Sequence, residues 1–259
     1  MSSSAGAGGA VVAVVPASMS SKRLPGKMLL DETGIPLVVH TWRRVAACDS
    51  VDRVLVATSS PEIRRAVESE GGEVFDTPAD VATGSDRVAA VASEVEGRWF
   101  LNVQGDEPTI DPGYLDRIAA ALRGGDDFVT VAEPIADRME WSDPNTVKVV
   151  FDAVGRALYF SRSAVPHERE GTRVAIEHLG HKHVGVYGFS RERLLEFARS
   201  ERGRLEMREG LEQLRALELG WTIRVLEGTG NTRGINTRED YDWFVGQWRE
   251  RAVEGVEDA

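Results

Sequence analysis

The sequence contains only one cysteine, Cys48, among its 259 residues. A single thiol cannot form a disulfide within the chain, and we expect Cys48 to be a packed side chain rather than a nucleophile. No apolar run reaches the roughly 18 residues that a membrane-spanning helix requires. The first apolar run, residues 10–15, is too short for a secretory signal and has no basic flank. These absences predict a cytoplasmic protein with no membrane partner.

Positive charge is also scarce. The chain has 31 Lys and Arg residues against 42 Asp and Glu residues, which gives a net charge of −11 and a pI near 5.1. Nucleic acids favour a basic surface, so we expect no nucleic-acid partner. An anionic substrate would have to meet a local cluster of cations. Lysine occurs only at Lys22, Lys27, Lys148 and Lys182.

Apolar runs alternate with helical patterns in the first half of the chain. Continuous apolar strands indicate a sheet that is covered on both faces. Strands that alternate with helices at this spacing indicate a parallel, doubly wound sheet, so we predict an α/β fold. The expected strands are residues 10–15, 51–57, 99–103 and 128–132, and the expected helices are residues 40–47, 87–95 and 114–122.

The second half is richer in strands and should form a smaller β-rich lobe on the same sheet. Residues 152–155, Asp-Ala-Val-Gly, are typical of a hairpin turn. Either Asn236 or Thr237 is suited to cap the last helix. The expected strands are residues 146–151, 157–161, 183–189 and 222–225, and the expected helices are residues 191–198, 205–219 and 238–252.

Two polar loops follow predicted strands, at the edge where open α/β sheets bind ligands. The first loop carries Lys22, Arg23 and Lys27 among small residues. This pattern suits phosphate binding, although a solvated basic loop is the simpler alternative. Asp106, in the second loop, could hold Mg²⁺ against phosphates, although a plain Gly-Asp turn would look the same. We expect both Lys27 and Asp106 to lie on exposed loops.

An ordered series of motifs links these loops to the rest of the chain. Over about residues 11–244 the sequence resembles the CMP-Kdo synthetase family. The motifs are Lys-Arg-Leu-Pro-Gly-Lys at 22–27, Val-Ala-Thr at 56–58, Gly-Ser-Asp-Arg at 84–87, Asn-Val-Gln-Gly-Asp-Glu-Pro at 102–108, Asn-Thr-Val-Lys-Val-Val at 145–150, Ala-Leu-Tyr-Phe-Ser-Arg at 157–162, Val-Gly-Val-Tyr-Gly at 184–188 and Leu-Glu-Gln-Leu-Arg at 211–215.

The resemblance implies a nucleotide-diphospho-sugar-transferase-like fold, with a Rossmann-like, mostly parallel sheet flanked by helices. It implies a cytidylyltransferase that moves CMP from CTP to a small anionic acceptor, with Mg²⁺ as cofactor, in a homodimer. Within a single domain over residues 10–252, residues 10–135 would bind CTP and residues 136–235 would form the acceptor or dimerisation lobe. Residues 1–9 should be a disordered N-terminus and residues 253–259 a flexible tail.

The resemblance also implies roles for particular residues. The catalytic residues would be Lys27, Arg23 and Asp106, and the metal ligands would be Asp106 and Asn236. CTP would be bound by Ala17, Ser18, Lys22, Arg23, Lys27, Thr58, Thr83, Gly84, Ser85, Arg87 and Gln104. The acceptor would be bound by Gln104, Arg162, His183, Tyr187, Glu212 and Gln213. Without the resemblance, His183 and Tyr187 would be read as strand packing, and Glu212 and Gln213 as helix surface.

The sequence departs from the family pattern at five positions. Ser18, Ser59, Val81 and His167 stand where the family has Arg, Asp, His and an aromatic residue. Asn236 stands where the family has an Asp that is its second metal ligand. An amide can offer a carbonyl oxygen but no charge, so the departure at Asn236 bears directly on the metal and the acceptor.

Two acceptors and one inactive alternative therefore stay open. Kdo is the family's usual acceptor, and all the expected sugar-acid residues are present. A phosphonate such as phosphonoformate brings its own negative charge, and the missing carboxylate at Asn236 favours it slightly. A catalytically inactive nucleotide-binding regulatory protein is the alternative of another class, although Arg23, Lys27 and Asp106 all remain.

Overall fold

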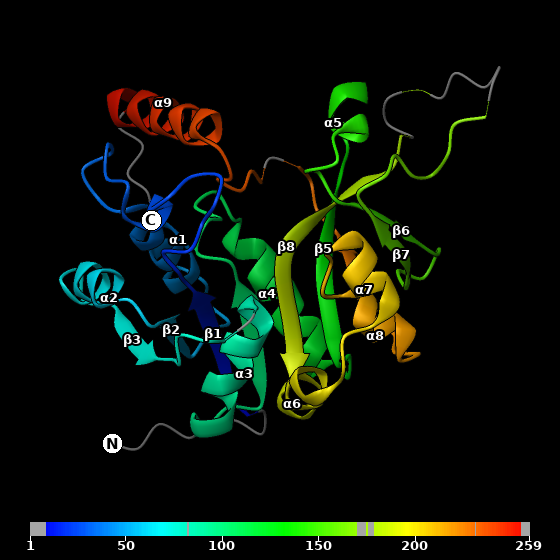
Figure 1. Ribbon diagram of the computed structural model, residues 1–259, viewed down its shortest axis with the longest axis horizontal. Coiled ribbons are helices and arrows are strands. Elements are labelled where there is room, and N and C mark those ends of the chain that lie inside the picture. Colours follow the sequence, from blue (N-terminus) through cyan, green and yellow to red (C-terminus); the bar gives the residue numbers. More distant parts are fainter. Residues whose placement is uncertain (1–8, 82, 170–174, 176–178, 231, 255–259) are drawn as a thin grey trace.

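One sheet of nine strands runs through the part of the chain that the structure describes (Figure 1). The computed structural model describes residues 9–81, 83–169, 175, 179–230 and 232–254. The main strands lie in the order β3 (Glu73–Asp76), β2 (Arg53–Thr58), β1 (Val11–Pro16), β4 (Trp99–Val103), β8 (His181–Ser190), β5 (Phe128–Pro134) and β9 (Arg224–Glu227). Strand β6 (Lys148–Phe151) pairs with β8 and with β7 (Ala157–Ser161).

The predicted α/β class is confirmed. Strands β1, β2 and β4 correspond to the first three predicted apolar runs and pair in parallel. Every residue of β1 and of β4 is buried, as continuous apolar strands in a covered sheet should be. The sequence analysis did not identify β3, which has only four residues and is exposed at both ends.

Strand β8 interrupts the parallel order. It lies antiparallel between β4 and β5, and it is long enough to pair with β6 as well. Strands β6 and β7 form the predicted hairpin. The start of β7 in turn bonds to the chain before β9, with the Ala157 amide donating to the Ile223 carbonyl at 2.9 Å. The strands of the second half therefore pair with one another as well as with the rest of the sheet.

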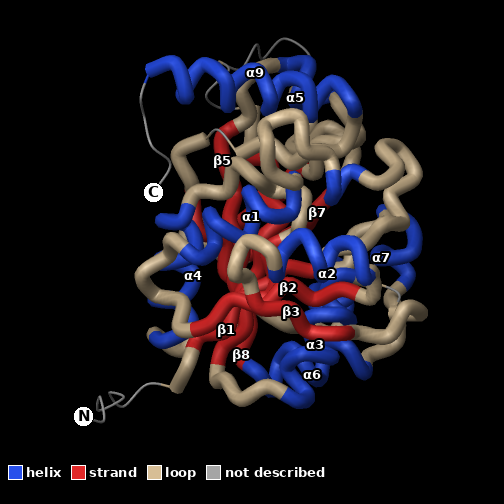
Figure 2. Tube along the Cα trace, turned by 90° about the vertical axis from the view of Figure 1, so that its left-hand side faces the viewer, coloured by secondary structure: helices blue, strands red, loops and turns tan. Residues whose placement is uncertain are grey.

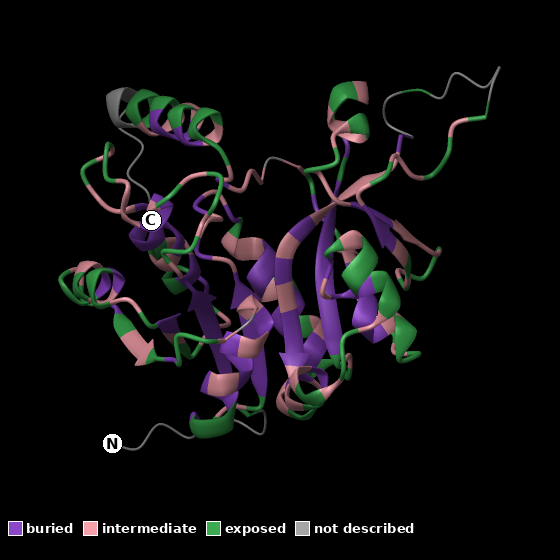
Figure 3. Cartoon of the chain, in the orientation of Figure 1, coloured by how far each residue is buried: buried purple, intermediate pink, exposed green. Residues whose placement is uncertain are grey.

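Helices cover both faces of the sheet, as seen edge-on in Figure 2. Alternate residues of β1 point to opposite sides and enter two separate cores. One core is closed by α1 (Leu37–Ala46), α2 (Pro61–Glu68) and α4 (Pro112–Arg123), and the other by α3 (Gly84–Glu94), α6 (Arg191–Arg199) and α8 (Leu214–Glu218). Strands β1, β4 and β5 are buried almost throughout, and exposed residues gather on the outer helix faces (Figure 3).

One predicted helix was wrong. Residues 205–219 form two short helices, α7 (Arg204–Glu209) and α8, instead of one continuous helix. Gly210 ends α7 with φ of 65°, a left-handed conformation that glycine adopts without steric cost. This break places Glu212 and Gln213 in the connection between α7 and α8, and Gln213 is buried there.

The last helix, α9 (Arg238–Glu254), lies at the same end of the molecule as α5 (Arg138–Ser142), opposite α6 (Figure 1). Thr237 caps it, because its Oγ1 accepts from the Asp240 amide at 3.2 Å. No helix in the described ranges is long and apolar enough to cross a membrane. The predicted disorder at residues 1–8 and 255–259 lies outside the described residues, whereas α9 itself continues to Glu254.

Candidate active site

Lys27 lies where three distant segments meet. It begins the 3-10 helix η1 (Lys27–Leu29), directly after the loop that leaves β1. Its Nζ forms an ion pair with Asp106 and donates to the Ile235 carbonyl at 2.7 Å. Lys27 is 7% exposed, so the expectation that it lies on an exposed loop was wrong. The loop folds back against the chain near Ile235, which sequence spacing alone could not indicate.

Arg23 brings Asn236 into the same cluster. Its guanidinium donates from Nη2 to Asn236 Oδ1 at 2.8 Å and from Nη1 to Asn145 Oδ1 at 3.1 Å. The Ile235 amide donates to the Asp106 carbonyl at 2.8 Å, which joins the two segments that carry the predicted metal ligands. The structure thus assembles Arg23, Lys27, Asp106 and Asn236 from three parts of the chain.

The donor atoms of this cluster fit magnesium. In the described residues no group of three or more His, Cys, Asp or Glu side chains could hold a metal ion. Mg²⁺ commonly takes only one or two protein oxygens and leaves its other positions to phosphate and water. The Asp106 carboxylate and the Asn236 amide carbonyl are hard oxygen donors of this kind. Both now face cations, which an incoming metal would have to displace.

The other residues of the β1 loop lie differently. Ala17 is buried at the end of β1, where its amide donates to the Ala57 carbonyl at 2.9 Å. Ser18 is half-buried, and its hydroxyl lies 2.6 Å from that of Ser20. Lys22 is exposed, and within the described residues it makes no hydrogen bond or ion pair. The structure therefore does not bring Lys22 into the cluster around Lys27.

A polar chain links the end of β4 to the start of α3. Gln104 Nε2 donates to Asn102 Oδ1 at 3.1 Å, and Asn102 Nδ2 donates to Ser85 Oγ at 3.3 Å. A Cβ added at Gly84 would lie 2.7 Å from Gln104 Nε2, so only glycine allows this approach. Thr83 caps α3 by accepting from the Asp86 amide at 3.1 Å. These predicted CTP-binding residues are thus placed together.

Arg87 and Thr58 lie deeper on the same side. Thr58 ends β2, is fully buried, and accepts from the Ser60 amide at 3.1 Å. The buried Arg87 guanidinium donates to the Thr77 hydroxyl, and it has no carboxylate partner among the residues described. Burial lowers the pKa of Arg87. A buried cation without a carboxylate partner is suited to bind an anionic ligand.

His183 and Tyr187 share one face of β8, as their spacing predicts, with ring centroids 5.2 Å apart. Burial lowers the pKa of His183 to about 3, so its ring is neutral at pH 7. Thr130 Oγ1 donates to the Val186 carbonyl at 2.7 Å and lies 3.0 Å from His183 Nε2. Because the Thr130 proton is used, Nε2 of His183 must be the donor, and Nδ1 is left as an acceptor.

Glu212 and Gln213 are polar groups with unmet hydrogen-bonding capacity. Glu212 Oε2 and Gln213 Nε2 are both buried and have no hydrogen-bond partner among the residues that the structure describes. Burial is the main cause that raises the pKa of Glu212, while hydrogen bonds from Ser85 and Thr83 lower it. Glu212 also contributes to a raised pKa at Tyr187, after burial. The acceptor residues therefore adjoin the start of α3.

Arg162, the last of the predicted acceptor residues, directly follows β7 and is held by backbone carbonyls of two other segments. Its Nε donates to the Glu209 carbonyl at 2.8 Å, and its Nη1 donates to the Pro144 carbonyl at 3.0 Å. Sequence reasoning missed Asn145, which accepts from Arg23, although it stands in one of the quoted motifs.

Glu107 was also missed. Burial and the neighbouring Asp106 raise the pKa of Glu107 to about 8, and its buried Oε2 has no hydrogen-bond partner in the described part of the chain. It directly follows Asp106 in the Gln-Gly-Asp-Glu-Pro motif, so the signal that could have found it was present in the sequence.

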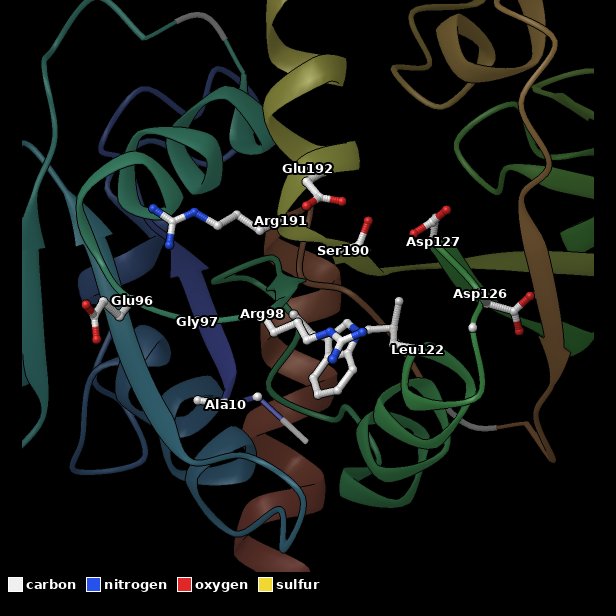
Figure 4. Close-up of a pocket in the computed structure, with 13 residues that line it drawn as sticks. Ala10, Glu96, Gly97, Arg98, Leu122, Asp126, Asp127, Ser190, Arg191 and Glu192 are labelled. Atoms are coloured by element: carbon white, nitrogen blue, oxygen red, sulfur yellow. The ribbon is translucent and has the colours of Figure 1, made fainter. Parts of the chain in front are cut away.

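A separate cavity of about 760 Å³ lies at the other end of the sheet (Figure 4). It is lined by Ala10 and Trp99, at the amino ends of β1 and β4, and by Arg98, Arg191 and Glu192. Ligands of open α/β sheets bind at the carboxyl ends of the strands, where Lys27 and Asp106 lie. This cavity is therefore not the candidate active site.

The fold and this site define a nucleotidyltransferase. The family model described as cytidylyltransferase matches residues 12–223. The solved structure of a CMP:2-keto-3-deoxy-manno-octonic acid synthetase complexed with CTP superposes with a TM-score of 0.86 at 34% identity, covering 93% of this chain and 99% of that one. The 4-diphosphocytidyl-2C-methyl-D-erythritol synthase of Anaerococcus prevotii shares the fold, with a TM-score of 0.64 at 14% identity over 93% and 98% of the two chains.

Curated relatives narrow the class further. A 3-deoxy-manno-octulosonate cytidylyltransferase of Chlorobium limicola is 43% identical over 235 residues, which cover 89% of this chain and 94% of that protein. One of Chlorobaculum parvum is 42% identical over 249 residues, covering 93% and 98%. The chain belongs to the CMP-Kdo synthetase family of cytidylyltransferases.

Proposed function

We propose that the protein transfers CMP from CTP to 3-deoxy-manno-octulosonate (Kdo), with release of pyrophosphate. The observation that carries this choice of acceptor is the pair of buried, unpartnered polar atoms Glu212 Oε2 and Gln213 Nε2. Buried polar groups are nearly always hydrogen-bonded, so unmet atoms in a site are suited to a ligand. The names of the relatives that are 41–43% identical support the same acceptor.

The chemistry of these atoms favours a hydroxylated acid over a phosphonate. A sugar hydroxyl can both donate and accept, whereas a fully ionised phosphonate offers only acceptors. His183 Nδ1 is an acceptor and Glu212 is a carboxyl group, so both suit hydroxyl donors. Phosphonoformate carries the charge of a phosphonate in addition to a carboxylate, so an ionised Glu212 would repel it more strongly than a sugar acid with one carboxylate. Asn236 alone suggests a phosphonate as the acceptor, but the polar groups around the acceptor favour Kdo and outweigh it.

The reaction requires positioning and charge neutralisation rather than a covalent intermediate. An acceptor hydroxyl oxygen attacks the α-phosphorus of CTP and gives up its proton, while the bond from that phosphorus to the bridging oxygen breaks and pyrophosphate leaves. Arg23 and Lys27 would bind the triphosphate and neutralise charge that develops as it departs. Arg162, His183, Tyr187 and Gln213 would orient the acceptor for in-line attack.

Asp106 and Asn236 would hold the Mg²⁺ ion against the triphosphate. When bound, the ion would supply further charge neutralisation on the phosphate oxygens. The ion pair between Lys27 and Asp106 would then be exchanged, which frees the Lys27 ammonium for the phosphates. We also propose a homodimer, on the family resemblance alone, which light scattering of the purified protein would test.

Substitution of the acceptor residues tests the proposal. Gln213→Leu keeps the size of the side chain and removes the unpartnered donor, so we expect the KM for Kdo to rise about tenfold or more while the KM for CTP changes little. Glu212→Gln should act in the same direction. A rise in the KM for CTP with no change for Kdo would contradict the assignment of these residues to the acceptor.

A further inference from the structure

Lys148 is a fully buried lysine that is not one of the predicted catalytic or ligand-binding residues. It opens β6 and is 0% exposed. Its Nζ donates to three backbone carbonyls: Thr146 at 2.6 Å, Asp143 at 2.7 Å and Arg162 at 2.9 Å. An ammonium group has three N–H donors, so these contacts satisfy all of them. Burial of an unpaired cation would otherwise be costly, and burial does lower the pKa of Lys148.

Two of these carbonyls belong to the turn at residues 143–146. Within that turn the Asp143 carboxylate accepts from the Asn145 amide at 2.8 Å and from Asn145 Nδ2 at 3.0 Å. Asn145 is therefore held with its Oδ1 available, and this oxygen accepts from Arg23. Lys148 thus holds the turn through its backbone carbonyls. The same turn, through Asn145, also positions Arg23, a predicted phosphate-binding residue.

The same turn also supports the side chain of Arg162. The Pro144 carbonyl, between the two carbonyls that Lys148 binds, accepts from Arg162 Nη1 at 3.0 Å. Lys148 in addition binds the Arg162 backbone carbonyl directly. Lys148 therefore helps to place both the backbone and the guanidinium of Arg162, a predicted acceptor-binding residue that Glu209 also holds through its carboxylate and its backbone carbonyl.

The choice of lysine at this position is informative. The chain has 31 basic residues, and lysine occupies only four of these positions, so the sequence strongly favours arginine elsewhere. A compact ammonium can point its donors at three carbonyls that surround it, whereas a planar guanidinium presents its donors in one plane. The carbonyl geometry thus explains why this buried position holds lysine.

We propose that Lys148 is a positioning residue that sets the geometry of the acceptor site by holding the 143–146 turn and Arg162 at a single point. The inference rests on the proposed function, since it assigns Arg162 to the acceptor. Lys148 binds the Arg162 carbonyl directly but reaches Arg23 only through Asn145 of the turn, so CTP binding should depend less on Lys148 than acceptor binding does.

Lys148→Met tests this role, because it keeps the apolar length of the side chain and removes the donors. Val149→Ala is the matched control, since Val149 is the next residue of β6, is 2% exposed and packs in the apolar core. We expect both variants to lower the melting temperature. Only Lys148→Met should raise the KM for Kdo, by about tenfold or more, while the KM for CTP rises less than about threefold.

Lys148→Arg provides a second measurement in case Lys148→Met does not fold. It keeps the charge and should leave the KM for Kdo raised, because the guanidinium cannot serve the three carbonyls together. Equal KM values for Kdo in Lys148→Met and Val149→Ala, or normal acceptor kinetics in Lys148→Arg, would overturn the inference. Absence of Kdo turnover by the unmodified protein would instead count against the proposed function itself.

Discussion

Arg23 Nη2 donates to Asn236 Oδ1 across 2.8 Å and thereby joins two residues that lie 213 positions apart in the chain. Asp106 is likewise paired with Lys27. Each oxygen donor of the candidate metal site therefore faces a cation. Binding of Mg²⁺ and CTP would exchange these contacts, with the metal taking the oxygens and the two cations taking the phosphates.

Restoring a carboxylate at position 236 should strengthen metal binding. In Asn236→Asp the added negative charge lies beside Asp106, so we expect the Mg²⁺ concentration for half-maximal turnover to fall about tenfold, with Kdo still preferred over phosphonoformate. Asn145→Asp is the matched control, because Asn145 also accepts from Arg23 but is not a predicted ligand. If the Mg²⁺ concentration for half-maximal turnover fell equally in both variants, the added charge would act through general electrostatic attraction and not as a metal ligand.

Removal of the Lys27 charge should abolish most turnover. Lys27→Met keeps much of the buried side chain, and we expect kcat to fall about 100-fold or more because charge on the departing pyrophosphate is no longer neutralised. The melting temperature should fall too, since Asp106 loses its buried partner. Arg65→Met, an exposed cation on α2, should leave kcat unchanged. Near-normal kcat in folded Lys27→Met would refute the role of Lys27.

Much of the sheet could be predicted from the distribution of apolar residues along the sequence. Strands β1, β2 and β4 are largely apolar runs, and their burial requires cover on both faces of the sheet. This distribution could not predict that β8 inserts antiparallel between β4 and β5, since strand order depends on contacts between distant segments. Helix α2 was overlooked, although Ser60 before Pro61 is a recognisable helix start.

The residues of the site could be predicted from the sequence better than the contacts between them. The motif residues Lys27 and Asp106 are indeed in contact. Nothing in the spacing indicated that Lys27 would be buried against Ile235, or that Lys148 would bind the Arg162 carbonyl. Such contacts form when tertiary packing brings distant segments together, and the local sequence of one segment does not indicate which other segment it will contact.

Gly84 offers a test of the nucleotide side of the site. In Gly84→Ala the new Cβ would displace Gln104, whose Nε2 would lie only 2.7 Å away, and we expect the Kd for CTP to rise about tenfold by calorimetry. Gly246→Ala in α9 is the matched control, because no atom lies within 4 Å of its added Cβ. It should leave CTP binding unchanged and raise stability by about 0.5–1 kcal/mol. Unchanged CTP affinity in Gly84→Ala would mean that Gln104 does not bind CTP.

His40 should make stability depend on pH. Burial, and secondly Arg43, lowers its pKa from 6.5 to about 4, and the ring packs against Phe244 and Trp248. The unfolded chain therefore binds the proton first, so the contribution is full above pH 6.5 and is lost as the pH falls toward 4. Between pH 7 and pH 5 the protein should lose about 2 kcal/mol more stability than His40→Phe, by urea unfolding. Equal losses would show that His40 is not responsible.

Transfer of CMP to Kdo can be followed through its products. The purified protein is incubated with CTP, Mg²⁺ and either Kdo or phosphonoformate, and ³¹P NMR follows pyrophosphate and the CMP-linked product together. We expect equal amounts of pyrophosphate and CMP-Kdo, with kcat/KM for Kdo at least about 100-fold above that for phosphonoformate, since a site built to bind hydroxyls rejects a ligand that leaves its polar groups unpaired. Turnover of phosphonoformate with none of Kdo, or no pyrophosphate with either acid, would contradict the proposed transfer to Kdo.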